Sequence, residues 1–196
     1  RSRAGENIII SVVTAPSFLL PVQSFLLNAA IALGTYDFFK KYAGDETRIK
    51  WPNDIYWRDR KAGGILIENS IQSKKWLYAV AGIGLNINQC HFEETVARPT
   101  SLRQITGKSF EVIDLAKELC ACLEARYETL KAGNETLILH NYGQAMYKLN
   151  EQVKFKHNGI LLEALVKGVT PDGLLIVETA NKKEEKWLWG TAEWIL

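Results

Sequence analysis

The side chains best suited to chemistry cluster around one proline-containing turn. Asn53 and Asp54 follow the proline, and Lys61 comes seven positions after Asp54. A glycine pair, Gly63 and Gly64, follows Lys61 and leads into an apolar run. A cation next to backbone without side chains can hold a compact anion close to main-chain amides. We therefore interpret this segment as the phosphate side of a nucleotide-activating site.

Each part of this cluster also has a plainer interpretation. The turn is compatible with an ordinary hairpin corner, since Asn and Asp tolerate turn conformations. Most lysines are simply solvated on the surface. The glycine pair argues against both interpretations, because glycine weakens the interior of an ordinary strand.

A second segment, residues 82–88, combines two glycines with alternating apolar residues. The alternation predicts a strand, and the glycines indicate that something approaches its backbone closely. Asn86 and Asn88 would lie on one face and offer amides to a purine edge or a ribose. A β-bulge with polar residues at a strand end fits the pattern equally well. The segment is not a dinucleotide-binding fingerprint, because the third glycine is missing and no helix follows.

A third segment, residues 98–102, predicts a loop that leads into a helical turn. Thr100 or Ser101 can cap that turn, and the local sequence requires nothing more. The three histidines of the chain are scattered, without a spacing typical of metal ligands. We therefore assign no metal site to protein side chains.

Hydrophobic patterning predicts the elements that would position these residues. A nearly continuous apolar run at 7–14 predicts a strand covered on both faces. A 3.6-residue period within 22–40 predicts a helix that Gly44 ends. Strands are then expected at 48–51, 55–58, 62–71 and 76–88, with a polar hairpin tip at 73–75. A second helix is expected at 111–131, where Gly133 and Asn134 end it, and a third helix follows to about Leu149.

The pattern changes near Asn150. Short apolar strands follow, separated by His-Asn-Gly at 157–159 and Pro-Asp-Gly at 171–173, which are strong turn signals. A run of short strands after helices predicts a separate small β-barrel. We therefore expect an α+β protein with one domain at 1–149 and a β-barrel domain at 150–196.

Size and composition limit the classes of function. The chain has 196 residues, 47% hydrophobic and 23% charged, which is enough for a full core. A net charge of +2 without a basic run gives no reason to expect nucleic-acid binding. The longest apolar run is too short to cross a bilayer, and the cysteines form no CxxC pair. We expect a soluble, cytoplasmic protein that binds neither nucleic acid nor membrane.

The order of these segments resembles the biotin protein ligase family. The matching motifs are Lys50-Trp51-Pro52-Asn53-Asp54, Lys61-Ala62-Gly63-Gly64-Ile65-Leu66, Gly82-Ile83-Gly84-Leu85-Asn86 and Pro99-Thr100-Ser101-Leu102. With the terminal barrel, the resemblance covers nearly the whole chain. It implies a mixed β-sheet catalytic domain of the biotin/lipoate ligase type, similar to class II aminoacyl-tRNA synthetases, followed by an SH3-like β-barrel.

The resemblance also implies a reaction. The family makes biotinyl-5′-AMP from biotin and ATP, with Mg²⁺, and passes biotin to a lysine of a biotin carboxyl carrier protein domain. Lys61 would contact the biotin carboxyl group and the α-phosphate, and Asp54 would lie near the incoming lysine as a candidate base. The residues implied to line the biotin site, mostly through their backbone, are Lys61, Gly64, Leu66, Gly82 and Leu85. Those implied to bind ATP or the adenylate are Asn53, Lys61, Asn86, Thr100 and Ser101.

One departure from the family pattern concerns the start of the chain. In the family, an arginine-rich loop and a tryptophan precede the stretch that residues 1–7 match. We therefore expect the 196 residues to lack the contacts with the biotin ring and the arginine-rich lid over the adenylate. We also expect them to catalyse ligation poorly. A sheet edge left free in this way would favour a homodimer. The DNA-binding helix-turn-helix of repressor-type members is not expected in these residues either.

Two other functions are compatible with the sequence. A lipoate ligase or octanoyltransferase uses a related catalytic fold on a different acyl group. A non-catalytic module that binds a small molecule or a carrier protein would keep the site without its chemistry. The spacing from W-P-N-D to K-x-x-G-I-L, together with the terminal barrel, favours biotin.

Overall fold

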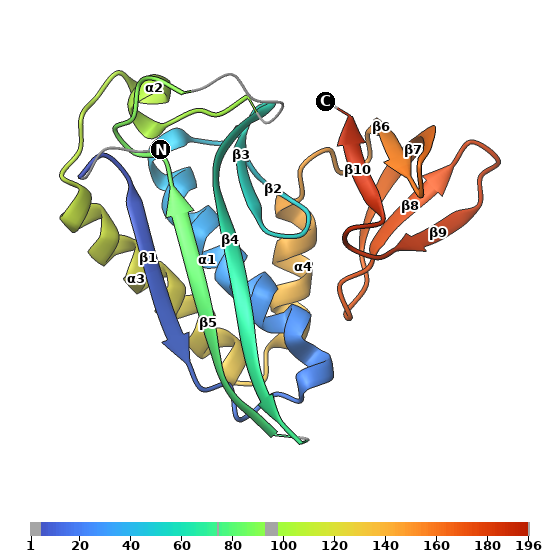
Figure 1. The fold of residues 1–196 in the computed structure, drawn as a ribbon, viewed down its shortest axis with the longest axis horizontal. Coiled ribbons are helices and arrows are strands. Elements are labelled where there is room, and N and C mark those ends of the chain that lie inside the picture. Colours follow the sequence, from blue (N-terminus) through green and yellow to red (C-terminus); the bar gives the residue numbers. More distant parts are fainter. Residues whose placement is uncertain (1–4, 74, 93–97, 196) are drawn as a thin grey trace.

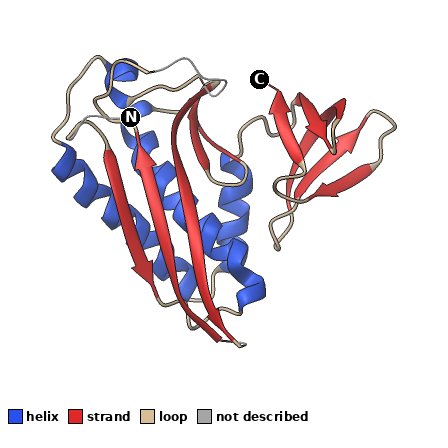
Figure 2. Cartoon of the chain, in the orientation of Figure 1, coloured by secondary structure: helices blue, strands red, loops and turns tan. Residues whose placement is uncertain are grey.

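A computed structural model describes residues 5–73, 75–92 and 98–195 of the chain. The described residues form two units: a sheet backed by helices, and a smaller all-β unit that carries the C-terminus (Figure 1, Figure 2). The fold is therefore α+β, as predicted. Within the described residues, no helix is both long enough and apolar enough to span a membrane.

The first unit contains a five-stranded sheet in the order β1-β5-β4-β3-β2. Its strands are β1 (Ile8–Thr14), β2 (Thr47–Lys50), β3 (Asp54–Trp57), β4 (Arg60–Gln72) and β5 (Lys75–Leu85). All neighbouring strands pair antiparallel. The predicted mixed sheet is thus corrected to an antiparallel one, because β2 to β5 follow one another through tight hairpins, which join only antiparallel strands. At the predicted hairpin tip between β4 and β5, Lys74 lies outside the described residues.

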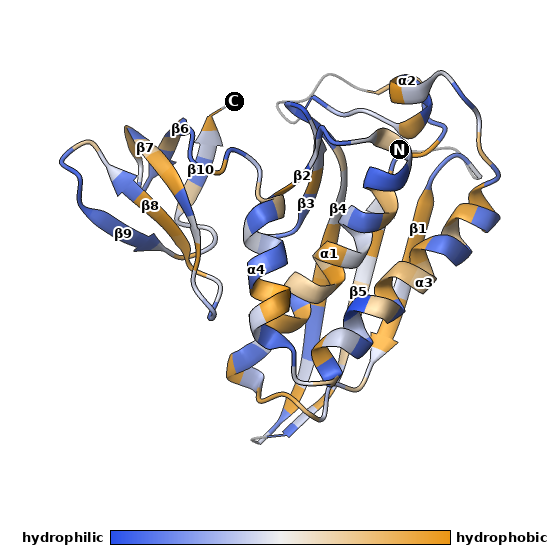
Figure 3. Cartoon of the chain, turned by 180° about the vertical axis from the view of Figure 1, so that it is seen from behind, coloured by the Kyte–Doolittle hydropathy of each residue, from blue (hydrophilic) through white to orange (hydrophobic). Residues whose placement is uncertain are grey.

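Helices cover one face of this sheet (Figure 3). The helices of the unit are α1 (Ser24–Ala43), α2 (Leu102–Thr106), α3 (Val112–Lys131) and α4 (Glu135–Ala145), with a short 3-10 turn η1 (Pro21–Gln23) before α1. α1 is buried nearly all round, because the sheet, α3 and α4 surround it. Gly44 ends α1 as predicted. α4 ends before the predicted Leu149, because Met146 has already adopted an extended conformation.

β1 lies at one edge of the sheet, and the face of β1 that points away from the helices is open. Ile8 is 1% exposed, whereas Ile9 is 73% and Val13 67% exposed. No described helix packs on that side, so the prediction of a strand covered on both faces is wrong. A run of β-branched residues indicates a strand, but it does not reveal whether a second layer covers it. Figure 1 looks onto this open face.

The second unit is an antiparallel sheet in the order β10-β6-β7-β8-β9. Its strands are β6 (Gln152–His157), β7 (Ile160–Val169), β8 (Leu175–Thr179), β9 (Glu184–Trp187) and β10 (Ala192–Ile195). The ring of Phe155 in β6 lies 5.2 Å from that of Trp187 in β9, although these strands are not neighbours, and 4.8 Å from that of Trp194. The sheet therefore curls around an aromatic core, as expected of a small barrel. The predicted domain division near Asn150 falls between α4 and β6.

Candidate active site

The turn between β2 and β3 is held from three sides. The Trp51–Pro52 peptide is cis. The carbonyl of Pro52 accepts hydrogen bonds from Asn28 Nδ2 at 3.0 Å and from Tyr142 Oη at 2.8 Å. The buried Trp51 donates through Nε1 to the carbonyl of Gly173 in the barrel at 2.9 Å. α1, α4 and the barrel thus fix the turn from which the functional side chains start.

Asp54 and Lys61 form an ion pair beside this turn. Lys61 Nζ lies 2.6 Å from Asp54 Oδ1, and the two side chains are 34% and 27% exposed. Asp54 pairs across the ladder with Gly64. A Cβ at Gly64 would lie 2.8 Å from Asp54 Oδ1 and 3.4 Å from Lys61 Nζ. The ion pair therefore occupies the space that a side chain at this position would need.

The segment before α2 fixes the backbone of Lys61. The Lys61 N–H donates to the carbonyl of Arg98 at 3.2 Å, and the Lys61 carbonyl accepts from the N–H of Thr100 at 2.8 Å. Ser101 Oγ accepts from the N–H of Gln104 at 3.2 Å and caps α2, as predicted. Thr100 and Ser101 are fully buried. Their burial leaves these side chains little free surface, and their contact with ATP stays a prediction.

Glycines from β4 and β5 form an open strip next to the ion pair. Gly64 pairs with Gly84, and Leu66 pairs with Gly82, so the two glycine segments lie side by side. Leu66 is 60% exposed on the uncovered face. A Cβ at Gly84 would meet no atom within 4 Å, and one at Gly82 only a backbone oxygen at 3.7 Å. Internal packing does not require these two glycines, and their effect is to leave a flat surface open.

Leu85 and Asn86 end this strip. Leu85 is 1% exposed, so only its backbone is left for the predicted biotin contact. Asn86 Nδ2 donates to the carbonyl of Thr100 at 2.9 Å. The amide of Asn88 likewise bonds the backbone of Phe110 in both directions. Both asparagines fasten the loops beside the site, and a nucleotide contact of Asn86 stays a prediction.

Lys50 faces the same site from β2. It lies across the ladder from Asp54, so the two side chains share a face of the sheet. Its Nζ donates to Tyr56 Oη at 3.2 Å and lies 4.9 Å from the centroid of the Tyr56 ring and 5.6 Å from that of Trp194. Burial lowers the pKa of Lys50, which the negative charge of Asp54 opposes. Burial also raises the pKa of Tyr56 to about 12, so its phenol stays protonated at neutral pH.

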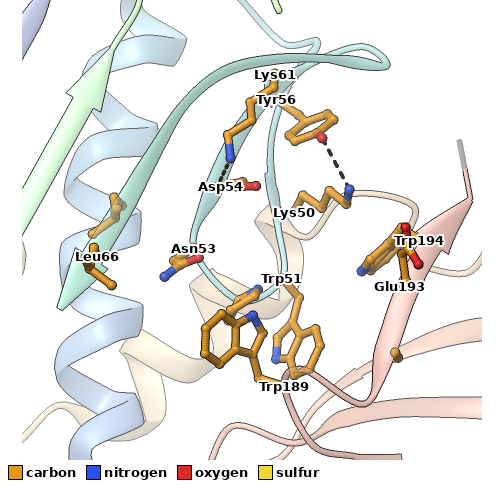
Figure 4. Close-up of a pocket in the computed structure, with 13 residues that line it drawn as sticks. Lys50, Trp51, Asn53, Asp54, Tyr56, Lys61, Leu66, Trp189, Glu193 and Trp194 are labelled. Carbon is orange, nitrogen blue, oxygen red and sulfur yellow. Dashed lines mark hydrogen bonds and ion pairs between the residues drawn. The ribbon is translucent and has the colours of Figure 1, made fainter. Parts of the chain in front are cut away.

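These side chains open onto a cavity of about 510 Å³ between the two units (Figure 4). In Figure 4, Asp54 and Lys61 lie between Leu66 on one side and Lys50 and Trp194 on the other. The residues that line the cavity are Lys50, Trp51, Pro52, Asn53, Asp54, Tyr56, Lys61, Ile65, Leu66, Trp189, Ala192, Glu193 and Trp194. The cavity thus combines two lysines and two carboxylates with a mostly aromatic and apolar wall.

The sequence predicted part of this cavity and missed the rest. It predicted that Asn53, Asp54 and Lys61 belong together, and the structure brings them together. It missed Lys50 and the wall that the barrel contributes. The only signal for Lys50 was its place in the K-W-P-N-D motif. No local pattern relates that motif to the tryptophans of the last strands.

Comparisons with known proteins relate this geometry to a family. Residues 4–86 match the biotin/lipoate A/B protein ligase family, and residues 148–193 match the biotin protein ligase C-terminal domain. The chain belongs to the biotin protein ligase family. The two matches cover the sheet of the first unit and most of the second unit.

Individual relatives agree with this assignment. The bifunctional ligase/repressor BirA of Bacillus spizizenii is 28% identical over 187 residues, which are 91% of this chain and 55% of that protein. The chain thus spans about half the length of the curated relatives it matches. The crystal structure of the biotin protein ligase from Aquifex aeolicus has a TM-score of 0.79 at 22% identity, over 96% of this chain and 82% of that one. The structure of the same enzyme in complex with biotin and ATP has a TM-score of 0.77 at 21% identity, over 96% of this chain and 78% of that one. These two structures show the fold.

Proposed function

We propose that this chain is the catalytic part of a biotin–[biotin carboxyl carrier protein] ligase. It would activate biotin with ATP to biotinyl-5′-AMP and then transfer the biotin to a lysine of a carrier domain. The observation that carries the proposal is the Lys61–Asp54 ion pair at the end of an open glycine strip. Support comes from the family to which the chain belongs and from the Aquifex aeolicus ligase, which has been crystallised with biotin and ATP.

The first half-reaction depends on Lys61. A carboxylate oxygen of biotin forms a bond to the α-phosphorus of ATP, and pyrophosphate leaves with the electron pair of the broken P–O bond. Negative charge builds up on the α-phosphate, and the Lys61 ammonium group would stabilise it. One preorganised donor of this kind is worth about 10²–10³ in rate. The strip of Gly64, Gly82 and Gly84 would seat the biotin against the sheet, with the exposed Leu66 as an apolar wall.

The second half-reaction needs a neutral amine, and Asp54 is the candidate to orient or deprotonate it. A free lysine amine has a pKa of about 10.4 and is almost wholly protonated at neutral pH. We expect Asp54→Asn to slow transfer from preformed biotinyl-AMP by about 10²-fold or more, as loss of a general base does. Single-turnover kinetics with a carrier domain measures this step alone. Transfer at the wild-type rate would show that Asp54 is not the base.

ATP would bring Mg²⁺ with it. In the described residues, no group of three or more His, Cys, Asp or Glu side chains is placed to bind a metal. Mg²⁺ commonly binds through substrate phosphates with few protein ligands, which fits this arrangement. Asn53 and Asn86 are the polar side chains that we propose for the nucleotide.

The partners and location follow from the proposed reaction. The carrier domain supplies the acceptor lysine, and the cytoplasm supplies ATP, so we propose a cytoplasmic ligase. β1 lies at the edge of its sheet, and such an edge can pair with a second copy of the chain. We therefore include a homodimer in the proposal, and light scattering of the purified chain tests it.

A transfer assay tests the proposed function. The chain is incubated with ATP, Mg²⁺, a carrier domain and either biotin, lipoate or octanoate, and the carrier is weighed by mass spectrometry. We expect the mass to rise by one biotinyl group and to stay unchanged with the other acids. A lipoyl or octanoyl increment would assign the chain to the related acyl ligases. No increment with any acid, together with calorimetric binding of biotin, would indicate a non-catalytic binding module.

A further inference from the structure

We propose that Lys50 is a second functional cation of this site, which keeps the acceptor lysine of the carrier domain in its neutral, nucleophilic form. The inference rests on the proposed ligase function. It goes beyond that function because it gives the second half-reaction an electrostatic element separate from Lys61 and Asp54. Two features of the cavity carry it: the uncompensated charge of Lys50 and the side from which an amine can enter.

The charge of Lys50 is not balanced by a close carboxylate. Within the described residues, its Nζ makes no ion pair, and its neighbours are the hydroxyl group of Tyr56 and the rings of Tyr56 and Trp194. This aromatic cage holds the ammonium group in place without neutralising it. Because the cage is partly buried, the charge is screened less than a surface charge would be.

The other charged groups that face Lys50 do not remove this excess. They are Asp54 on β3, Lys61 on β4 and Glu193 on β10. Asp54 is already paired with Lys61 at 2.6 Å. Glu193 is exposed, and it lies opposite the exposed Lys156 in the β10–β6 ladder. The field of Lys50 is therefore free to act on a group that enters the cavity.

The amine would enter from the side of Lys50. Asp54 and Lys61 separate Leu66 from Lys50 and Trp194 (Figure 4). With the biotinyl-AMP seated along the glycine strip on the Leu66 side, the cavity gives an amine access to the carbonyl carbon from the opposite side. The ring of Trp194 lies on that side (Figure 4) and suits the alkyl part of a lysine side chain.

The chemical effect of Lys50 is on the protonation of the acceptor. A nearby cation disfavours the ammonium form of an amine and lowers its pKa. The acceptor thus loses its first proton to water at a lower pH. Its nitrogen then bonds the carbonyl carbon, the bond from that carbon to the phosphate oxygen breaks, and AMP leaves with the electron pair. The remaining extra proton on the nitrogen passes to the carboxylate of Asp54.

The test is the pH dependence of transfer from preformed biotinyl-AMP to a carrier domain, measured in single turnovers. The variants are Lys50→Met, Lys50→Arg and the control Lys186→Met, which removes an exposed lysine of β9. For Lys50→Met we expect transfer about tenfold slower at neutral pH, with the rising limb displaced by about one unit to higher pH. Lys50→Arg keeps the charge and should stay close to the wild-type profile. The pH profile of Lys186→Met should coincide with that of the wild type.

Three results would overturn the inference. The first is a Lys50→Met profile that superimposes on that of the wild type. The second is equal slowing at every pH with a lower melting temperature, which would mean that Lys50 only holds the barrel through Trp194. The third is a Lys50→Arg variant as slow as Lys50→Met. Absence of biotin transfer by the wild-type chain at all pH values would instead refute the proposed function itself, so the two failures are distinguishable.

Discussion

Two adjacent glycines of the site have different tasks at the scale of single residues. Gly64 lies on the open face, where its missing side chain leaves room for the Asp54–Lys61 ion pair. Gly63 lies on the buried face, where a Cβ would be 2.4 Å from the carbonyl oxygen of Gly84. The pair is therefore not a loop that wraps an anion. One glycine allows two strands to approach, and the other allows two charges to meet.

Replacing Gly64 by alanine tests the space that the ion pair needs. The new Cβ would lie 2.8 Å from Asp54 Oδ1, and it would displace the ends of two flexible side chains rather than backbone. We expect Gly64→Ala to lower biotin-dependent pyrophosphate exchange by about tenfold or more, since misplaced catalytic groups cost at least that much. The melting temperature should change little. Exchange at the wild-type rate would show that the position of the ion pair is not critical.

The sequence predicted the grouping of Asp54 and Lys61 better than their surroundings. Asp54 and Lys61 were predicted because their types, spacing and glycine neighbours form one local pattern. The motif that contains Thr100 and Ser101 did not reveal that both residues are buried, because a local motif does not distinguish an exposed hydroxyl group from a buried one. The cage of Lys50 could not be predicted, since Trp194 joins it only through the tertiary fold.

At the scale of elements, close packing of α1 against α3 supports the sheet that carries the site. Gly34 lies in the middle of α1, and a Cβ there would be 2.8 Å from the Cα of Leu123 in α3. Arg126 Nε bonds Asp37 Oδ2 at 2.6 Å across the same contact. The two helix backbones therefore approach each other as closely as the absence of a side chain permits.

The substitution Gly34→Ala improves the helix propensity of α1 but disturbs its packing against α3. Alanine gains about 1 kcal/mol over glycine within a helix. The contact with the α3 backbone should outweigh this gain, because overpacking costs about 1–3 kcal/mol. We expect a net loss in the free energy of unfolding, measured by urea denaturation. Gly143→Ala in α4 is the matched control: its Cβ would meet nothing within 4 Å, so this variant should be neutral or more stable. A stabilised Gly34→Ala would contradict the close approach of the two helices.

The elements themselves were largely predictable. The helix at 111–131 and the glycine that ends α1 follow from apolar periodicity and from the backbone freedom of glycine, which are local properties. The coverage of β1 and the antiparallel order of the sheet depend on which elements pack together. Apolar runs and turn signals do not contain that information, so both predictions needed correction.

At the scale of the whole molecule, the barrel supports the active-site turn. The carbonyl of Gly173, in the β7–β8 turn, accepts the hydrogen bond of Trp51. A Cβ at Gly173 would lie 2.5 Å from the ring of Phe25 in α1, and this glycine has a φ of +91°. The ring of Tyr147, which follows α4, lies 5.9 Å from that of Trp194. The barrel therefore contributes directly to the wall of the candidate site.

Gly173→Ala should loosen this support. We expect a lower melting temperature and slower transfer, because the new Cβ pushes the turn away from Phe25 and weakens the bond to Trp51. Gly159→Ala is the control: its φ is +84°, but its Cβ would meet nothing within 4 Å. It carries the same backbone strain without the clash. Equal effects of the two variants on transfer would mean that contact with the barrel does not matter for the site.

The central claim is that Lys61 activates biotin at the end of the glycine strip. The most direct measurement is the biotin-dependent exchange of labelled pyrophosphate into ATP by the wild-type chain and by Lys61→Met. We predict exchange that requires biotin in the wild type and is about 10²–10³-fold slower in the variant, with folding preserved according to circular dichroism. Exchange by Lys61→Met at the wild-type rate would contradict the account.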